Sequence, residues 1–147
     1  MTPGELARAC ADAMWATDHA SRGLGMTIRA VEPGRAVLEM EVAGTMVNGH
    51  GMCHGGFIFT LADSAFAFAC NSRNEQCVAQ HCAITYLRPA HLGEVLCAEA
   101  TERSREGRSG IYDVRVTAGD GRVIAEFRGT SRTIGRKFFP DLVEGSP

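Results

Sequence analysis

The pattern of apolar and polar positions predicts a helix, two strands, a long second helix and then only strands. In residues 3–16 charged residues lie between the apolar ones, which indicates a short amphipathic helix rather than a signal peptide or a membrane span. From Ala36 to Val42 apolar side chains recur at every second position, after a Pro33-Gly34 turn. We therefore expect two strands joined at that turn, with one apolar face.

The most apolar stretch follows a glycine-rich loop and extends over about 16 residues, to residue 71. It contains no proline and, after Gly56, no glycine, and Asp63 is its only charged residue. This composition predicts a long helix that is buried over most of its surface.

Beyond residue 76 the pattern predicts four strands separated by turns that contain glycine. The predicted strands are residues 77–89, 94–104, 109–118 and 122–134, and the last turn holds an Asp120-Gly121 pair, which favours a type I′ hairpin. Consecutive strands joined in this way form an antiparallel sheet, which needs a cover over one face. Because the long helix is the only suitable cover, we expect an α+β hotdog fold, a curled antiparallel β-sheet of about five to six strands wrapped around a long central helix.

The length of 147 residues is that of one domain. We expect a single domain over 1–147, with the N-terminal helix at about 3–16, the core at about 23–135 and a C-terminal tail at 136–147 that ends in mobile residues. The net charge of -2 argues against a large nucleic-acid-binding face. Six cysteines without C-x-x-C spacing argue against a zinc ribbon and fit free thiols in a reducing cytoplasm.

Three short motifs around the long helix resemble one known family. They are Asn48-Gly49-His50, Cys53-His54-Gly55-Gly56 and Leu61-Ala62-Asp63-Ser64, with further matches in the downstream segments YLRPA, GIYDVRV and FRGTSRTIG. Over roughly residues 25–135 the chain closely resembles the PaaI-type thioesterases, the phenylacetyl-CoA thioesterase group of the hotdog superfamily. The resemblance implies acyl-CoA thioester hydrolysis in phenylacetate catabolism, no metal, no cofactor apart from the coenzyme A of the substrate, and dimers that commonly pair into tetramers.

The same resemblance implies roles for four residues. Asp63 matches the catalytic carboxylate of the family, and Gly55 matches the residue whose backbone N–H polarises the thioester carbonyl. Asn48 matches the residue that helps to hold the attacking water. His54 matches a neighbour of the oxyanion site.

Helix geometry sets a condition on these roles that does not depend on the family. Gly55 and Asp63 are eight residues apart, which is about 12 Å along one helix at a rise of 1.5 Å per residue. A general base, or its water, must lie within about 3 Å of the group that it serves. One thioester can therefore reach both residues only if they come from different copies of the chain, as in an antiparallel pair of helices around a two-fold axis. We expect a homodimer with shared active sites.

These residue types suit thioester hydrolysis. The free N–H groups at the start of a helix stabilise an oxyanion, and Gly55 and Gly56 leave the backbone open to the substrate carbonyl. A carboxylate in an apolar helix either titrates at a higher pH or finds donors, and desolvation makes Asp63 a stronger base. Direct attack by Asp63 to form an anhydride is the competing mechanism. A solvent-facing or loop-capping Asp63 is the alternative to both.

The acyl group and coenzyme A need further contacts. Phe59 and Phe66 share the helix face of Asp63 and are candidates for an aromatic-lined acyl pocket as well as for core packing. Ser64 is a candidate for a supporting hydroxyl or a helix-packing residue. The candidates for binding the coenzyme A phosphates are Arg88, Arg132, Arg136 and Lys137, with Arg105 and Arg108 as weaker ones, and each also fits an ordinary solvated surface position.

Other chemistries find less support in the sequence. His50, Cys53 and His54 lie close together but in a loop without a further ligand cluster, so we expect no metal site. Cys53 has no evident base to hold it as a thiolate, and no P-loop or dinucleotide motif is present. The predicted function is hydrolysis of phenylacetyl-CoA or a related aromatic acyl-CoA. The alternatives are a broad medium-chain acyl-CoA thioesterase and a non-catalytic acyl-CoA-binding sensor, whereas the paired Asp and His of a hotdog hydratase are not evident.

Overall fold

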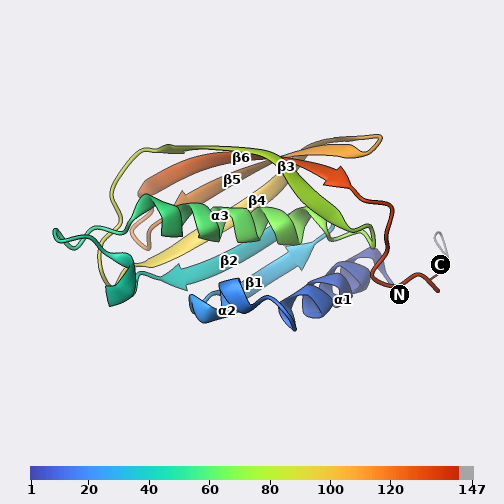
Figure 1. Ribbon diagram of the computed structural model, residues 1–147, viewed down its shortest axis with the longest axis horizontal. Helices are drawn as coiled ribbons and strands as arrows, with labels where there is room; N and C mark the ends of the chain where they lie inside the picture. Colours follow the sequence, from blue (N-terminus) through green and yellow to red (C-terminus); the bar gives the residue numbers. More distant parts are fainter. Residues whose placement is uncertain (143–147) are drawn as a thin grey trace.

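Six antiparallel strands form one sheet that curls around a single long helix (Figure 1). The computed structural model describes residues 1–142. Its elements are α1 (Pro3–Trp15), α2 (His19–Gly23), β1 (Thr27–Glu32), β2 (Arg35–Glu41), the 3-10 turn η1 (Gly44–Met46), α3 (Gly55–Cys70), β3 (Cys77–Tyr86), β4 (Val95–Glu106), β5 (Ser109–Thr117) and β6 (Val123–Thr133). The strand order is β1-β2-β4-β5-β6-β3. The predicted hotdog arrangement is confirmed, with six strands.

The central helix α3 packs against the inner face of the sheet. Its buried side chains are Ile58, Leu61, Ala62, Ala65, Phe66, Phe68, Ala69 and Cys70. Phe66 is only 1% exposed, and its ring centroid lies 5.6 Å from that of Tyr112 and 5.8 Å from that of Phe127. Gly129 on β6 makes room for this ring, because a Cβ there would lie 2.8 Å from it. Close packing of this kind fixes α3 relative to the strands.

The helices and strands predicted from the sequence are confirmed, but one connection is not the expected hairpin. β3 pairs with β6, whereas β4 pairs with β2 and β5. Residues 87–94 therefore cross from one edge of the sheet to its middle. The crossover is fixed by contacts between segments that are distant in sequence. The Gly93 N–H donates to the carbonyl of Val42 and the Val42 N–H donates to that of Glu94, which aligns the start of β4 with the end of β2.

The turn between β5 and β6 also differs from the prediction. A type I′ turn needs positive φ at both central residues, but Gly121 has a φ of 91° while Asp120 keeps a negative one. The Gly121 N–H donates to the carbonyl of Ala118 at 3.0 Å, and the Ala118 N–H donates to that of Arg122 at 3.0 Å. The connection is thus a three-residue loop that ends in a left-handed glycine.

Both ends of the described chain are held against the fold. Helix α1 lies beside β1 in Figure 1 and begins with a Thr2 side chain that accepts from the Glu5 N–H. Near the other end, Asn74 exchanges two hydrogen bonds with the backbone of Phe139. Residues 143–147 of the predicted mobile tail lie outside the described residues. No helix within residues 1–142 is long and apolar enough to cross a membrane.

Candidate active site

The start of α3 presents backbone donors. His54 is the N-cap residue, with extended backbone angles and no capping hydrogen bond from its side chain, which is exposed. Within residues 1–142 the N–H groups of Gly55 and Gly56 donate to no acceptor. Unsatisfied N–H groups at a helix N-terminus, reinforced by the helix dipole, bind groups with negative charge. This end of α3 can therefore stabilise a developing oxyanion.

Gly55 and Gly56 are glycines for different reasons. The Tyr86 hydroxyl donates to the carbonyl of Gly55 at 2.9 Å, and its ring lies so close that a Cβ on Gly55 would be 2.9 Å from it. A Cβ on Gly56 would meet nothing within 4 Å. The expectation that both glycines keep the backbone open to substrate is therefore incomplete, because at Gly55 the space is used by a tyrosine of β3.

Asn48 lies in the exposed loop before α3. Its Oδ1 accepts from the backbone N–H groups of His50 at 2.9 Å and Met52 at 3.2 Å, so one side of the amide shapes the loop. Its Nδ2 has no acceptor among the described residues and remains available to a water or a substrate. Its role in holding the attacking water stays a prediction.

A cavity of about 500 Å³ opens between the start of α3 and the end of β3. It is lined by Cys53, Gly55, Ile58, Tyr86, Leu87, Arg88 and Pro89. Its size is within the range of small-molecule sites. Asp63 is not among its lining residues, so a single chain does not combine the cavity and the carboxylate.

Asp63 lies in the middle of α3 and is half-buried. Burial raises the pKa of its carboxyl above the ordinary value, and a hydrogen bond from Cys82 partly opposes that rise. The Cys82 thiol on β3 donates to Oδ1 at 3.9 Å and is the only hydrogen-bond donor to the Asp63 side chain within residues 1–142. The structure therefore excludes the loop-capping alternative. A carboxylate without a cation beside it is suited to accept a proton.

The three neighbours of Asp63 that the sequence assigned to the substrate occupy different surroundings. Phe66 is fully buried in the core, whereas Phe59 is half-buried and packs edge-on against Phe127, with ring centroids 5.5 Å apart. The Ser64 hydroxyl lies 2.8 Å from that of Ser21, which donates in turn to Asp18. These contacts support core packing for Phe66 and helix packing for Ser64. The position of Phe59 is compatible with core packing and with a place in the acyl pocket.

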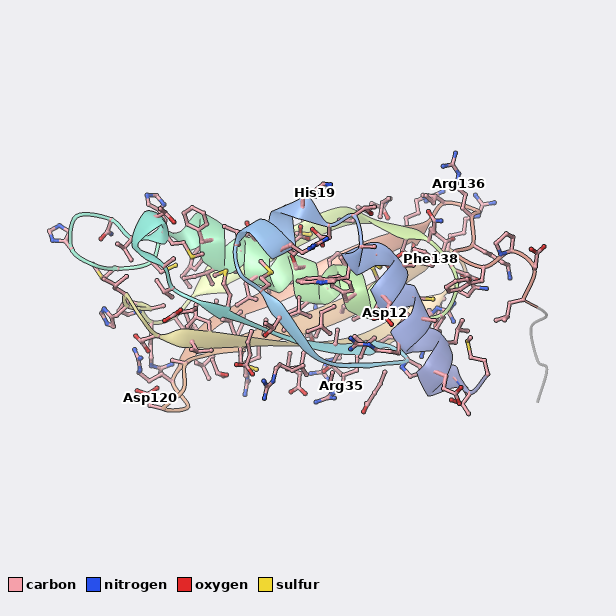
Figure 2. The ribbon with its side chains drawn as sticks, turned by 90° about the horizontal axis from the view of Figure 1, so that it is seen from below. Asp12, His19, Arg35, Asp120, Arg136 and Phe138 are labelled. Carbon is pink, nitrogen blue, oxygen red and sulfur yellow. The ribbon has the colours of Figure 1, made fainter. Side chains whose placement is uncertain are left out.

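The basic residues expected at the coenzyme A site are split between two ends of the molecule. Arg88 lines the cavity beside Gly55, where its Nη1 donates to the carbonyl of Val123 at 3.0 Å. Arg136 and Lys137 line a smaller cavity of about 210 Å³ near the start of β3. Figure 2 places Arg136 at the end opposite the loop that precedes α3. The last of the four main candidates, Arg132, is exposed near the end of β6.

Alternative chemistries find no support in this arrangement. Within residues 1–142 no group of three His, Cys, Asp or Glu side chains could hold a metal ion. Burial raises the pKa of the Cys53 thiol, which disfavours the thiolate that a nucleophile needs. All six cysteines are free.

Two residues beside the site were not assigned a role from the sequence. Tyr86 is part of the segment YLRPA, but nothing in one sequence shows that its ring lies on Gly55. Cys82 faces α3 because a bulge between Ala79 and His81 shifts the alternation of β3 by one residue. A bulge of this kind has no signature in the strand pattern.

Comparison with known proteins gives consistent matches. Residues 50–125 match the family model described as Thioesterase superfamily. The acyl-coenzyme A thioesterase PaaI of Escherichia coli K12 is 42% identical over 125 residues, which cover 85% of this chain and 89% of that protein. The solved structure of E. coli PaaI, from the phenylacetic acid degradation operon, has a TM-score of 0.91 at 40% identity and covers 92% of this chain and 99% of its own. A mutant phenylacetic acid degradation protein PaaI from Thermus thermophilus has a TM-score of 0.76 at 38% identity, covering 80% of this chain and 100% of its own.

Proposed function

The chain belongs to the thioesterase superfamily, and from that premise we propose that it hydrolyses acyl-CoA thioesters to the free acid and coenzyme A. The observation that carries the proposal is Asp63, a half-buried carboxylate on the central helix whose pKa is raised and which forms no ion pair with any of residues 1–142. The fold around it is shared with E. coli PaaI over most of the chain.

In the proposed reaction Asp63 takes a proton from a water that Asn48 helps to hold. The resulting hydroxide attacks the thioester carbonyl, and the Gly55 N–H stabilises the oxyanion, with His54 beside it. Collapse of the tetrahedral intermediate breaks the C–S bond, and coenzyme A leaves as the thiolate, which takes up a proton. Attack by Asp63 itself to form an anhydride is the alternative, in which water then releases the acid.

The site is completed by a second copy of the chain. Gly55 and Asp63 lie within one straight helix, about 12 Å apart at the usual rise, so one substrate cannot touch both in one chain. Strand β3 supports pairing of two copies, because it is a ten-residue edge strand whose side chains are mostly exposed. A long unprotected edge of this kind presents unpaired N–H and C=O groups to which another strand can bind.

The contacts within one chain suggest the register of that pair. Tyr86 of β3 lies against Gly55, and Cys82 of β3 lies against Asp63. Gly55 of one copy meets Asp63 of the other when Tyr86 of one β3 lies opposite Cys82 of the second. An antiparallel pair in this register has its two-fold axis at Ile84.

The helix supports the same axis. Phe59 is midway between Gly55 and Asp63 in α3, so the axis that exchanges them passes near it. Its ring packs on Phe127, the residue that pairs with Ile84 in the sheet. Helix and strand therefore share one two-fold axis. Further pairing of dimers into a tetramer remains part of the proposal.

The antiparallel dimer also brings together the basic residues that lie at opposite ends of one chain. The end of α3 near Arg136 and Lys137 in one copy points toward the end near Gly55 and Arg88 in the other. Coenzyme A phosphates that bind beside Gly55 of one copy would therefore lie near the basic residues of the second copy. Arg132 extends the same basic surface. Gly56, which has open space around it, provides a further backbone donor.

For the acyl group we propose phenylacetyl or a related aromatic acid, with Phe59 in its pocket. The supporting facts are the phenylacetic acid degradation context of two related structures and the half-buried aromatic ring near Asp63. A broad medium-chain preference and a non-catalytic acyl-CoA sensor are the competing functions. We further propose that the protein needs no metal or cofactor and works in a reducing cytoplasm, in line with its six free cysteines.

A panel of acyl-CoA substrates tests the function. Release of coenzyme A thiol is followed with a thiol reagent for phenylacetyl-CoA, benzoyl-CoA and aliphatic acyl-CoAs of increasing length. We expect the highest kcat/KM for the aryl-acetyl substrate and a loss of about 10³-fold or more in kcat for Asp63→Asn. The matched control is Asp12→Asn, which changes an exposed carboxylate on α1. Binding without thiol release would establish the sensor, and normal turnover by Asp63→Asn would exclude Asp63 as the base.

A further inference from the structure

Cys82 is brought to Asp63 by an irregularity in β3. A bulge between Ala79 and His81 reverses the inward and outward alternation, so that Cys82 and Ile84 are half-buried while their neighbours in sequence are exposed. The partner of Cys82 across the sheet is Gly129, the same glycine that gives space to Phe66. A thiol is thus placed on the face of the strand that looks toward α3.

The contact between the two side chains is directional. The Cys82 Sγ donates to Oδ1 of Asp63 at 3.9 Å, and no donor to Oδ2 lies within residues 1–142. The carboxylate therefore has one oxygen held by the protein and one available to a water. A base works best when its rotamer is fixed and its proton-accepting oxygen is free.

The thiol keeps its proton in this position. Burial and the negative charge of Asp63 both raise the pKa of Cys82, so it is neutral at neutral pH and acts as a donor. The other titratable group that senses Asp63 is Cys70, which lies seven residues further along α3 and whose pKa is also raised. Both thiols are uncharged when Asp63 is ionised, and no cationic side chain within residues 1–142 contributes to the pKa shift of the carboxyl.

We propose that Cys82 is a positioning residue for thioester hydrolysis, whose S–H group holds one oxygen of Asp63 and leaves the other for the attacking water. This inference rests on the proposed function, because it assumes that Asp63 is the base. The hydrogen bond has a second consequence. It favours the ionised form of Asp63 and so keeps the carboxylate from losing its charge at the pH at which it must act.

The test compares Cys82→Ala, which removes the donor, with Cys82→Ser, which keeps an O–H donor on the same Cβ. In the pH profile of kcat/KM we expect the acidic limb of Cys82→Ala to move to higher pH and that of Cys82→Ser to move to lower pH or stay. At neutral pH the alanine variant should lose about three- to tenfold in kcat with little change in KM. Cys97→Ala on β4 is the control for removal of a half-buried thiol elsewhere and should leave the profile unchanged.

A direct titration separates this inference from the function itself. The pKa of the Asp63 carboxyl is measured by 13C NMR in the wild type and in both variants, with oligomeric state and thermal unfolding checked for each. A higher pKa in Cys82→Ala that Cys82→Ser reverses supports the inference whether or not a substrate has been found. Equal Asp63 pKa values in all three proteins, or equal shifts for alanine and serine, would overturn it and leave only a packing role.

Discussion

The ionisation of one carboxyl group, that of Asp63, affects both the stability and the proposed activity of this protein. Because burial raises the pKa of Asp63 in the folded chain, folding favours its protonated form. The stability that Asp63 contributes is fully present below the pKa that its carboxyl has in the unfolded chain. It is lost as the pH rises through the higher pKa that the carboxyl has in the folded chain. The ionised base thus destabilises the fold at the pH at which it is active.

Replacement of Asp63 by asparagine is predicted to stabilise the protein at neutral pH, because it removes a half-buried charge. We expect the melting temperature to rise by about 2–4 °C, the shift that about 1 kcal/mol produces in a domain of this size. The gain should shrink as the pH is lowered toward the range in which the wild-type carboxyl is protonated. Thermal unfolding of both proteins from pH 4 to pH 8 measures it. A gain of the same size at every pH would mean that ionisation of Asp63 is not its source.

The two glycines at the start of α3 are predicted to differ in their tolerance of a methyl group. Gly55→Ala pushes the Tyr86 ring from its place and so disturbs the backbone around Gly55, whose N–H is the oxyanion donor, whereas Gly56→Ala meets open space. We expect Gly55→Ala to lower kcat by about 10- to 100-fold and Gly56→Ala to have a much smaller effect. Steady-state kinetics of both variants make the comparison.

A double variant isolates the cause. In a Tyr86→Ala background no ring opposes the new methyl group, so Gly55→Ala should lower kcat by less than it does in the wild type, a coupling between neighbours. An equal loss of kcat in the two backgrounds would show that the methyl group acts by blocking the substrate and not by displacing the tyrosine.

At the scale of elements, the sequence predicts what each segment is better than it predicts which segments pair. The apolar run before Cys70 and the alternating strands identify α3 and all six strands, because burial on one face leaves a period in the sequence. Which strand pairs with β3 cannot be read from any period in the sequence. Its pairing with β6, the crossover at residues 87–94 and the bulge that turns Cys82 inward depend on contacts between distant segments.

The site shows the same division. Asp63, Gly55 and Asn48 stand out by their type and spacing, and the motifs around them carry the family resemblance. Tyr86 and Cys82 belong to an ordinary strand pattern, and only the packing of β3 on α3 reveals their contacts. For Phe66 and Ser64 the sequence leaves two roles open, and the contacts in the structure support the packing role of each.

Pairing of β3 with a second β3 around Ile84 predicts a specific cross-link. Ile84→Cys places a thiol opposite its own copy, where directly paired Cα atoms are about 4.5–5.5 Å apart, within the range of a disulfide. Mild oxidation should convert most of the protein to a covalent dimer on a non-reducing gel. Val95→Cys, an exposed position on β4, serves as the control for random cross-linking. A monomer band for Ile84→Cys under oxidation strong enough to begin linking Val95→Cys at random would exclude this register.

For the whole molecule, the central claim is that each active site takes Asp63 from one chain and Gly55 from another. Two variants, each inactive alone, separate these contributions. Asp63→Asn removes the base, and Gly56→Glu places a negative charge beside the oxyanion donors at a position where the fold has open space. Neither change is expected to disturb the β3 edge through which the copies pair.

Mixing the two variants is the measurement that tests the claim most directly. Equal amounts are unfolded and refolded together, and thiol release from acyl-CoA is compared with that of each variant treated alone. In a dimer of one chain of each kind, one site carries both defects and the other carries none, so random pairing should restore about a quarter of the wild-type activity. Recovery of that activity is the predicted result. A mixture that forms dimers but stays as inactive as its components would contradict the shared site.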